Sequence, residues 1–275
     1  AELNEIIPIP NYAYKDRPSW ANLTKPSSFC SGWMNAGYIV GAISMQEQWV
    51  EFCRGEVKGH LAKPRSIIKK TDHKAIAAAL QCGYDCYDDI ATDPNHRYLS
   101  WEYCHAAFKQ HRQQHDEATV DFLCLHLAWY LASWGMLRNS FLMQKDYKIH
   151  IPVIEELLRE KYDPLMGIKC SDFKKESNQK LLEEITDFIS GYYDMIRKSV
   201  KPQEIKNDVS YTLITKILMG TLGCVPAYDR YFIAGVKNRK VATGIYNIKS
   251  VLQLVDFYEK NEDRLDQVRQ NMTVF

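Results

Sequence analysis

The stretch that decides the fold is residues 209–236, VSYTLITKILMGTLGCVPAYDRYFIAGV. It begins as an apolar helix, is interrupted by glycines, and then forms a Pro-Ala-Tyr-Asp corner that opens a second helix. Asp229 therefore stands where a buried helix ends and another begins. A carboxylate at such a corner can be desolvated and held at the mouth of a cleft, which makes it our candidate reactive group. The alternative is that Asp229 only caps the second helix, since Asp is a preferred N-cap residue.

The rest of the chain also reads as helical. The run 119–137 is apolar on nearly every face, which predicts a buried central helix. Residues 177–198 repeat apolar side chains every three or four positions, which predicts an amphipathic helix. Residues 99–115 predict a polar, exposed helix with Ser100 as its cap, and shorter helices are expected at 151–161 and 245–260. No alternating strand pattern occurs, so the sequence predicts an all-α fold.

Composition is that of an ordinary globular protein, with 275 residues, 46% apolar and 25% charged. The net charge of +1 excludes a strong overall attraction to nucleic acid, although a local basic face is compatible with it. No apolar run reaches the roughly 18 residues that span a bilayer. The N-terminus lacks the features of a signal peptide, and the eight cysteines are scattered. We therefore expect a cytoplasmic protein with reduced thiols and no membrane partner.

Motifs for metal, nucleophilic or phosphate-loop chemistry are missing. Cys82 and Cys86 lack a second pair of ligands at zinc spacing, and HExxH does not occur. GxSxG, GxxxxGK[ST] and GxGxxG do not occur either. The sequence thus predicts neither a metal ion nor a cofactor. We expect an N-terminal arm and helical lobe over 1–115, suited to a particular substrate, and a helical core over 116–275.

Three polar residues around the apolar run define an alternative site. His126 lies inside the run, Arg138 follows its end, and His150 lies further along. Structural roles would also explain them. His126 would then be a hydrogen-bonded histidine in the core, and Arg138 would pair with the end of the helix. Together they could instead serve an all-α nuclease or nucleotide-processing enzyme. A third possibility is a non-catalytic helical module that binds protein or nucleic acid, in which Asp229 is only a cap.

The octapeptide 222–229, LGCVPAYD, resembles the signature of the helix-hairpin-helix (HhH-GPD) DNA glycosylases. In that family a helix ends in Leu-Gly or Phe-Gly, a short turn contains Pro, and an Asp opens the next helix. The order of helices over 119–260 is similar as well. The resemblance implies a two-lobed helical bundle that acts as a monomer on double-stranded DNA, without a cofactor.

The same resemblance implies hydrolysis of the N-glycosidic bond of a damaged or modified base, including hypermodified phage bases. Asp229 would be the catalytic carboxylate, which stabilises positive charge on the sugar as the flipped base departs. The implied pocket residues are Trp129, Trp134, Tyr228 and Tyr231 for stacking, with Arg138, Asn139 and Gln144 as polar readers.

The chain departs from the family at the hairpin. The family hairpin reads Leu-Pro-Gly-Val-Gly, whereas residues 204–210, EIKNDVS, contain no glycine. Tyr211 stands where bifunctional members carry a lysine, and Lys216 is off register, so the resemblance implies a monofunctional hydrolase. The expected phosphate contacts are Lys206, Asn207, Ser210, Lys237, Arg239 and Lys240.

Overall fold

The computed structural model describes residue 95 and residues 99–138, 140–200, 209–238, 240–263 and 265–266. Of these residues 73% are helical, and no strand occurs among them, which confirms the predicted all-α fold. Residues 1–94, most of the predicted N-terminal arm and lobe, lie outside the described residues. The boundary at residue 115 and the two-lobed arrangement therefore stay predictions.

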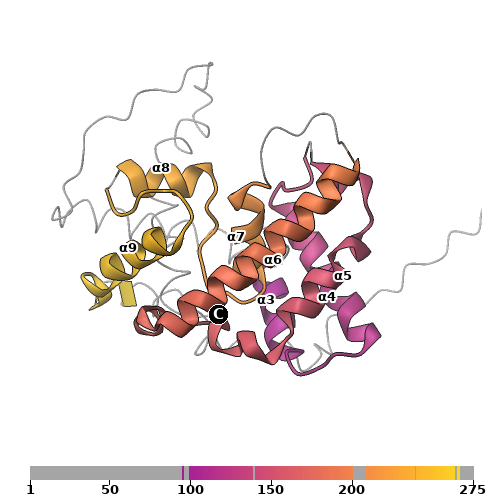
Figure 1. Cartoon of the computed structure of the whole chain (residues 1–275), viewed down its shortest axis with the longest axis horizontal. Coiled ribbons are helices and arrows are strands. Elements are labelled where there is room, and N and C mark those ends of the chain that lie inside the picture. The colour runs from indigo at the N-terminus through magenta and orange to yellow at the C-terminus, as the bar shows by residue number, and fades with distance from the viewer. Residues whose placement is uncertain are drawn as a thin grey trace, which may run out of the picture.

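Eleven helical elements follow one another along the described part of the chain, and Figure 1 shows the α-helices. They are α3 Ser100–Gln110, α4 Glu117–Ser133, η4 Phe141–Gln144, η5 Tyr147–His150, α5 Ile151–Leu157, η6 Glu160–Leu165, η7 Cys170–Lys174, α6 Glu176–Val200, α7 Tyr211–Gly220, α8 Arg230–Asn238 and α9 Ile248–Glu259. In Figure 1 the long helix α6 crosses the middle of the view, with α9 and α8 on one side and α4 and α5 on the other. None of the helices in these ranges is long and apolar enough to cross a membrane.

Helix α4 occupies the centre, as its apolar sequence predicts, and packs against α3, α5, η5 and α7. Its first turn is capped by Asp116, whose carboxylate accepts a hydrogen bond from the Thr119 amide at 3.0 Å. The prediction of a buried helix is wrong for one face of α4. Phe122, Leu125 and Trp129 are 41%, 47% and 67% exposed, respectively. On the opposite face of α4, Leu123, Leu127 and Leu131 are fully buried and form part of the core.

Helix α3 corrects the prediction of an exposed helix over 99–115. It ends at Gln110, and one face, with Trp101, Cys104 and Phe108, is buried against α4 and α7. Those positions lie three and four apart, so they form one stripe despite the polar residues between them. Ser100 is inside the helix and is not its cap: its Oγ lies 2.5 Å from the Oγ of Ser133 at the end of α4.

Helix α6 confirms the predicted amphipathic helix and extends it by a few residues at the ends. Ile185 and Ile189 lie at the centre of its buried stripe, as expected, together with Leu182 and Tyr193. Near its C-terminal end Asp194 accepts a hydrogen bond from the amide of Val209 at 2.8 Å. That bond joins α6 to the residues that enter α7.

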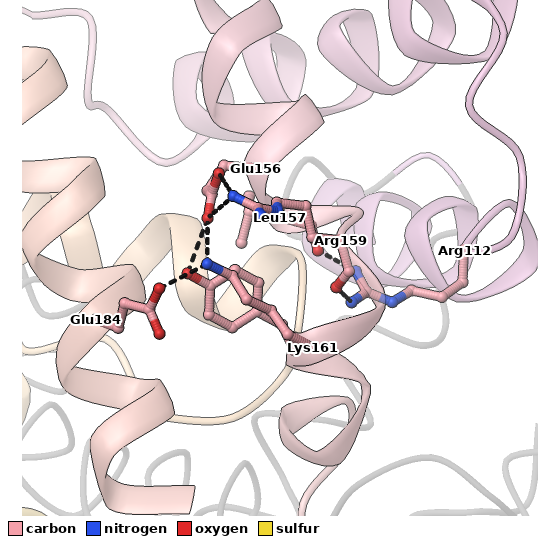
Figure 2. Close-up of polar contacts among 7 residues, drawn as sticks. Arg112, Glu156, Leu157, Arg159, Lys161 and Glu184 are labelled. Atoms are coloured by element: carbon pink, nitrogen blue, oxygen red, sulfur yellow. Dashed lines mark hydrogen bonds and ion pairs between the residues drawn. The ribbon is translucent and has the colours of Figure 1, made fainter.

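A buried arginine joins the loop after α3 to the end of α5. Arg112 is 7% exposed, and its Nε donates to Asp163 at 2.7 Å. Its other guanidinium nitrogens donate to the backbone carbonyls of Leu157 and Arg159 (Figure 2). All three contacts satisfy a buried charge, so we interpret Arg112 as structural.

A second polar network beside it joins η6 to α6. The ammonium of Lys161 contacts Glu156 at 2.9 Å and Glu184 at 2.6 Å (Figure 2). Glu156 also accepts a hydrogen bond from the hydroxyl of the buried Tyr162 at 2.9 Å. Both networks lie on elements outside the α7–α8 corner, so they position helices rather than build the candidate site.

Candidate functional site

The path from α7 to α8 is set by a glycine that ends α7. Gly223 has a φ of +64°, a conformation that side chains with a Cβ rarely adopt. Its amide donates to the carbonyl of Leu218 at 2.9 Å, which closes the end of the helix. A Cβ at this position would lie 2.6 Å from the Cε1 of His105. The His105 ring in turn holds the corner, since its Nδ1 is 2.8 Å from the carbonyl of Thr221.

The segment 224–228 runs back along α7, and two threonines of α7 hold it there. Thr215 Oγ1 accepts a hydrogen bond from the amide of Tyr228 at 2.8 Å. Thr212 Oγ1 donates to the carbonyl of the same tyrosine at 2.9 Å. The segment is buried throughout, so these bonds satisfy a backbone that water does not reach. They place Asp229 beside the first turns of α7.

Asp229 is the N-cap of α8. Its Oδ1 accepts hydrogen bonds from the amides of Tyr231 at 3.0 Å and Phe232 at 2.9 Å. The residue is half-buried, and among the described residues no hydrogen bond is made to its Oδ2. Capping thus occupies one carboxylate oxygen and fixes the orientation of the other.

A buried lysine lies within electrostatic reach of this carboxylate. Lys216 is 6% exposed, and its Nζ donates to the carbonyl of Trp134 at 3.0 Å. The same ammonium lies 5.5 Å from the centre of the Trp134 ring. Burial lowers the pKa of Lys216, and the negative charge of Asp229 opposes that shift. Lys216 therefore joins α7 to the end of α4 through its side chain.

Tyr130 completes the contact between α4 and α7. Its hydroxyl donates to the carbonyl of Lys216 at 3.1 Å, and its ring meets the Trp134 ring edge-on at 5.8 Å. Burial raises its pKa well above the usual value, and the charge of Asp229 adds to that effect. The Tyr130 ring packs directly against Gly220, where an added Cβ would lie 2.4 Å from the ring, so a larger residue does not fit at this position. We call Tyr130, Trp134, Lys216 and Asp229 the acid–lysine cluster.

Three of the four predicted stacking residues lie at or near this cluster, in different settings. Trp134 is half-buried and belongs to it. Tyr231 is half-buried next to Asp229, and the Arg230 guanidinium lies 4.5 Å from the centre of its ring. Tyr228 is 1% exposed, and its hydroxyl lies 3.0 Å from that of Ser250, so its ring forms part of the core.

The remaining predicted pocket residues lie further out. Trp129 is on the exposed outer face of α4. Arg138 and Gln144 are both exposed, the first in the turn after α4 and the second in η4. Asn139 lies outside the described residues.

The predicted phosphate contacts fall near the starts and ends of α7 and α8. Ser210 precedes α7, Lys237 lies in the last turn of α8, and Lys240 follows it; all three are exposed. The bond between Thr212 and Tyr228 brings the starts of the two helices together. Lys206, Asn207 and Arg239 lie outside the described residues.

The residues of the alternative site have separate surroundings. The His126 ring packs edge-on against Phe122 at 4.4 Å. His150 is 2% exposed, and its Nδ1 is 2.5 Å from the Tyr193 hydroxyl on α6. Arg138 is exposed beyond the end of α4. The contacts of His126 and His150 involve different residues, so they support separate structural roles for the two histidines.

Sulfur and metal chemistry receive no support from the part of the chain described. Cys104, Cys124, Cys170 and Cys224 are free and buried. Burial raises the pKa of Cys124 and Cys224 to about 12, which disfavours the reactive thiolate. Within the described ranges, no group of His, Cys, Asp and Glu could hold a metal ion.

Lys216 is the residue whose position sequence reasoning missed. The family resemblance places the catalytic lysine of bifunctional members at the position of Tyr211, so Lys216 was not predicted to lie at the site. A signal was present, since Lys216 is the one charged residue in the apolar helix 211–220. A lone charge in such a helix must either reach solvent or find a partner. The structure shows that it finds the Trp134 carbonyl.

No protein-family model, curated protein or solved structure matches this chain.

Proposed function

We propose that the chain is a DNA N-glycosylase, a monofunctional hydrolase that removes a damaged or modified base from double-stranded DNA. One observation carries the proposal: Asp229 is fixed through Oδ1 by two amides, while its Oδ2 makes no hydrogen bond among the described residues and a buried ammonium is near. The resemblance of residues 222–229 to the glycosylase corner points the same way.

The chemistry suits a fixed carboxylate. Breaking the bond between a base and its sugar builds positive charge on the sugar ring. A preorganised negative group stabilises that charge without having to reorient during the reaction. The free oxygen of Asp229 would also position a water molecule and take its proton. Two amides of α8 hold the group in place for both tasks.

The surroundings supply groups that a flipped nucleotide would need. Tyr231 offers an aromatic ring next to Asp229, and the Trp134 ring lies against the Lys216 ammonium. A base must leave the stack before it can react. Arg230 is exposed next to Asp229, and Arg138 is exposed in the turn after α4; both could contact phosphates or base edges. Ser210, Lys237 and Lys240 would contact the backbone of the duplex, and one protein molecule would suffice for one site.

The experiment incubates the protein with DNA duplexes that carry a panel of damaged and modified bases. Abasic sites are then detected by cleavage in hot alkali. We expect wild-type protein to release a base and Asp229→Asn to lose at least about 100-fold in rate, since the charge that stabilises the sugar is gone. Asparagine is as good an N-cap as aspartate, so the variant keeps the helix.

The matched control is Asp146→Asn. Asp146 is exposed and caps η5, where it accepts a hydrogen bond from the amide of Lys148 at 2.9 Å. That variant removes an equal charge from an equivalent cap and should keep the wild-type rate. Full activity of Asp229→Asn would leave Asp229 as a cap only. Absence of base release by the wild-type protein across the panel would overturn the proposed function itself.

A further inference from the structure

We propose that the exposed face of α4 is the docking surface for an N-terminal segment of this same chain, residues 43–53. We call the row formed by Phe122, Leu125 and Trp129 the outer face of α4. The inference is independent of the proposed function. It says which part of the N-terminal region packs against the described core, and where.

Three large apolar side chains form the outer face. Phe122, Leu125 and Trp129 follow one another at spacings of three and four, so they lie on one side of α4. All three are exposed, and Trp129 is the most exposed of them. Single exposed apolar residues are ordinary, but a contiguous row of them marks an interaction surface. The described elements leave this row open, so its partner lies outside them.

Ring contacts hold the outer face in a fixed shape. The Phe122 ring lies between two histidine rings, with centroids 5.2 Å away at His111 and 4.4 Å away at His126. His111 directly follows α3, so this helix borders the Phe122 end of the row. A side chain that is already ordered loses little conformational entropy when a partner binds. The outer face is therefore preorganised for docking.

The N-terminal part of the chain enters the described fold at the other end of this row. Ser133 lies one helical turn beyond Trp129, and hence on the same side of α4. Its Oγ is 2.5 Å from the Oγ of Ser100, the first residue of α3. The residues that precede Ser100 therefore join the core beside the Trp129 end of the outer face.

Residues 43–53, ISMQEQWVEFC, have the sequence of an amphipathic helix. Met45, Trp49 and Phe52 recur at spacings of four and three and share one side. The opposite side carries polar residues, namely Ser44, Glu47, Gln48 and Glu51. Such a short helix is stable in water only when its apolar side is packed against something. The segment lies outside the described residues, so this helix is a prediction from its sequence.

The two apolar rows match in length and in kind. The row from Met45 to Phe52 covers as many positions as the row from Phe122 to Trp129, about 10 Å along a helix. Each row contains two aromatic side chains, which pack well edge-on or offset against one another. Docking would bury both rows and leave the polar side of the segment in water.

The covalent connection favours this segment over a separate molecule. Residues 54–99 tie the segment to the start of α3, which lies at the end of the outer face. Docking within one chain acts at an effective concentration of up to about 1 mM for a connection of suitable length. A second copy of the chain reaches that concentration only in a very concentrated solution.

A photo-activated cross-linker on the outer face of the intact chain tests this docking. Trp129 is replaced by benzoylphenylalanine, the dilute protein is irradiated, and mass spectrometry identifies the attached peptide. We expect attachment to residues 43–53 of the same molecule. Position 195 is the control, since Met195 is 57% exposed on α6. The cross-linker placed there should not attach to residues 43–53.

Hydrogen exchange measures the same contact without a cross-linker. Trp129→Glu places a charge on the outer face, so the amides of residues 43–53 should exchange at least about 10-fold faster. Met195→Glu puts the same charge on an exposed position of α6 and should leave them unchanged. The amides of α7, which is buried in the core, should keep the wild-type rate in both variants.

The other outcomes overturn the proposal. Cross-links between two molecules would make the outer face an interface between copies of the chain. Attachment to another part of residues 1–98, or no attachment to them, would show that residues 43–53 do not cover the face. Unchanged exchange of residues 43–53 in Trp129→Glu would show the same. If the α7 amides also exchange faster in that variant, the core itself is disturbed, and the cross-linking result decides.

Discussion

At the scale of single residues, the geometry of Asp229 is compatible with both its structural role as a cap and the proposed chemical role. One oxygen caps α8 through two amides, and the other oxygen has no such partner among the described residues. The cap and catalytic interpretations therefore do not exclude each other. The cap explains why the carboxylate is held in one orientation, and orientation is what electrostatic stabilisation requires.

The two roles of Asp229 can be separated by stability. Asp229→Ala removes both the charge and the cap, whereas Asp229→Asn removes the charge alone. We expect the alanine variant to be less stable than the asparagine variant by about 1 kcal/mol in the free energy of unfolding. Urea denaturation at neutral pH measures this difference. Equal stabilities would show that the α8 cap adds nothing to the fold.

At the scale of elements, the corner between α7 and α8 depends on close packing of backbone against side chains. Thr212 and Thr215 hold the returning segment against α7, and the His105 ring lies against Gly223. His105 of α3 contacts the corner at the carbonyl of Thr221 as well. A shift there would move Asp229 relative to α4 and so alter the acid–lysine cluster.

Gly223→Ala tests this packing. A left-handed conformation costs an ordinary residue roughly 1–2 kcal/mol, and the new Cβ would also lie 2.6 Å from the His105 ring. We therefore expect a loss of at least about 2 kcal/mol in the free energy of unfolding. Gly191→Ala is the control, because Gly191 lies inside α6 with open space around it. That change should stabilise the protein by about 0.5–1 kcal/mol. A mild effect at Gly223 would mean that the His105 ring moves aside.

At the scale of the whole molecule, two buried histidines join helices that are distant in sequence. His105 connects α3 to the end of α7, and His150 connects η5 to Tyr193 on α6. Burial lowers the pKa of each from 6.5 to about 4. Both rings are therefore neutral in the folded protein at neutral pH, and protonation of either would disrupt a packed junction.

These histidines predict acid sensitivity of the whole fold. Between pH of about 6.5 and 4 the unfolded chain binds protons that the folded chain does not, so stability falls as pH falls through that window. Each histidine should contribute up to about 1.4 kcal/mol per pH unit. Urea unfolding of the wild type at pH 7 and pH 5 measures the sum. His150→Gln should lower stability at pH 7 but reduce the pH dependence, with His115→Gln as the control for loss of a histidine. An unchanged pH dependence in His150→Gln would contradict this account.

Local sequence patterns predicted the elements well where the pattern was strong. The apolar repeat of α6 and the Gly–Pro corner before α8 both correspond to observed features. Each depends on residues within a few positions of one another, which is the range over which helix periodicity and capping act. The burial of α3 was missed, because its apolar stripe is short and separated by polar residues.

The sequence by itself determined an all-α chain and an aspartate that opens a helix after a glycine-rich break, since both follow from local backbone preferences. Only the tertiary structure decided which side chains surround that aspartate. Lys216 meets the Trp134 carbonyl across 82 positions of sequence, and Tyr130 meets the Lys216 carbonyl across 86. Contacts of that separation depend on how helices pack, and helix packing depends on the shape of the whole core rather than on any local pattern.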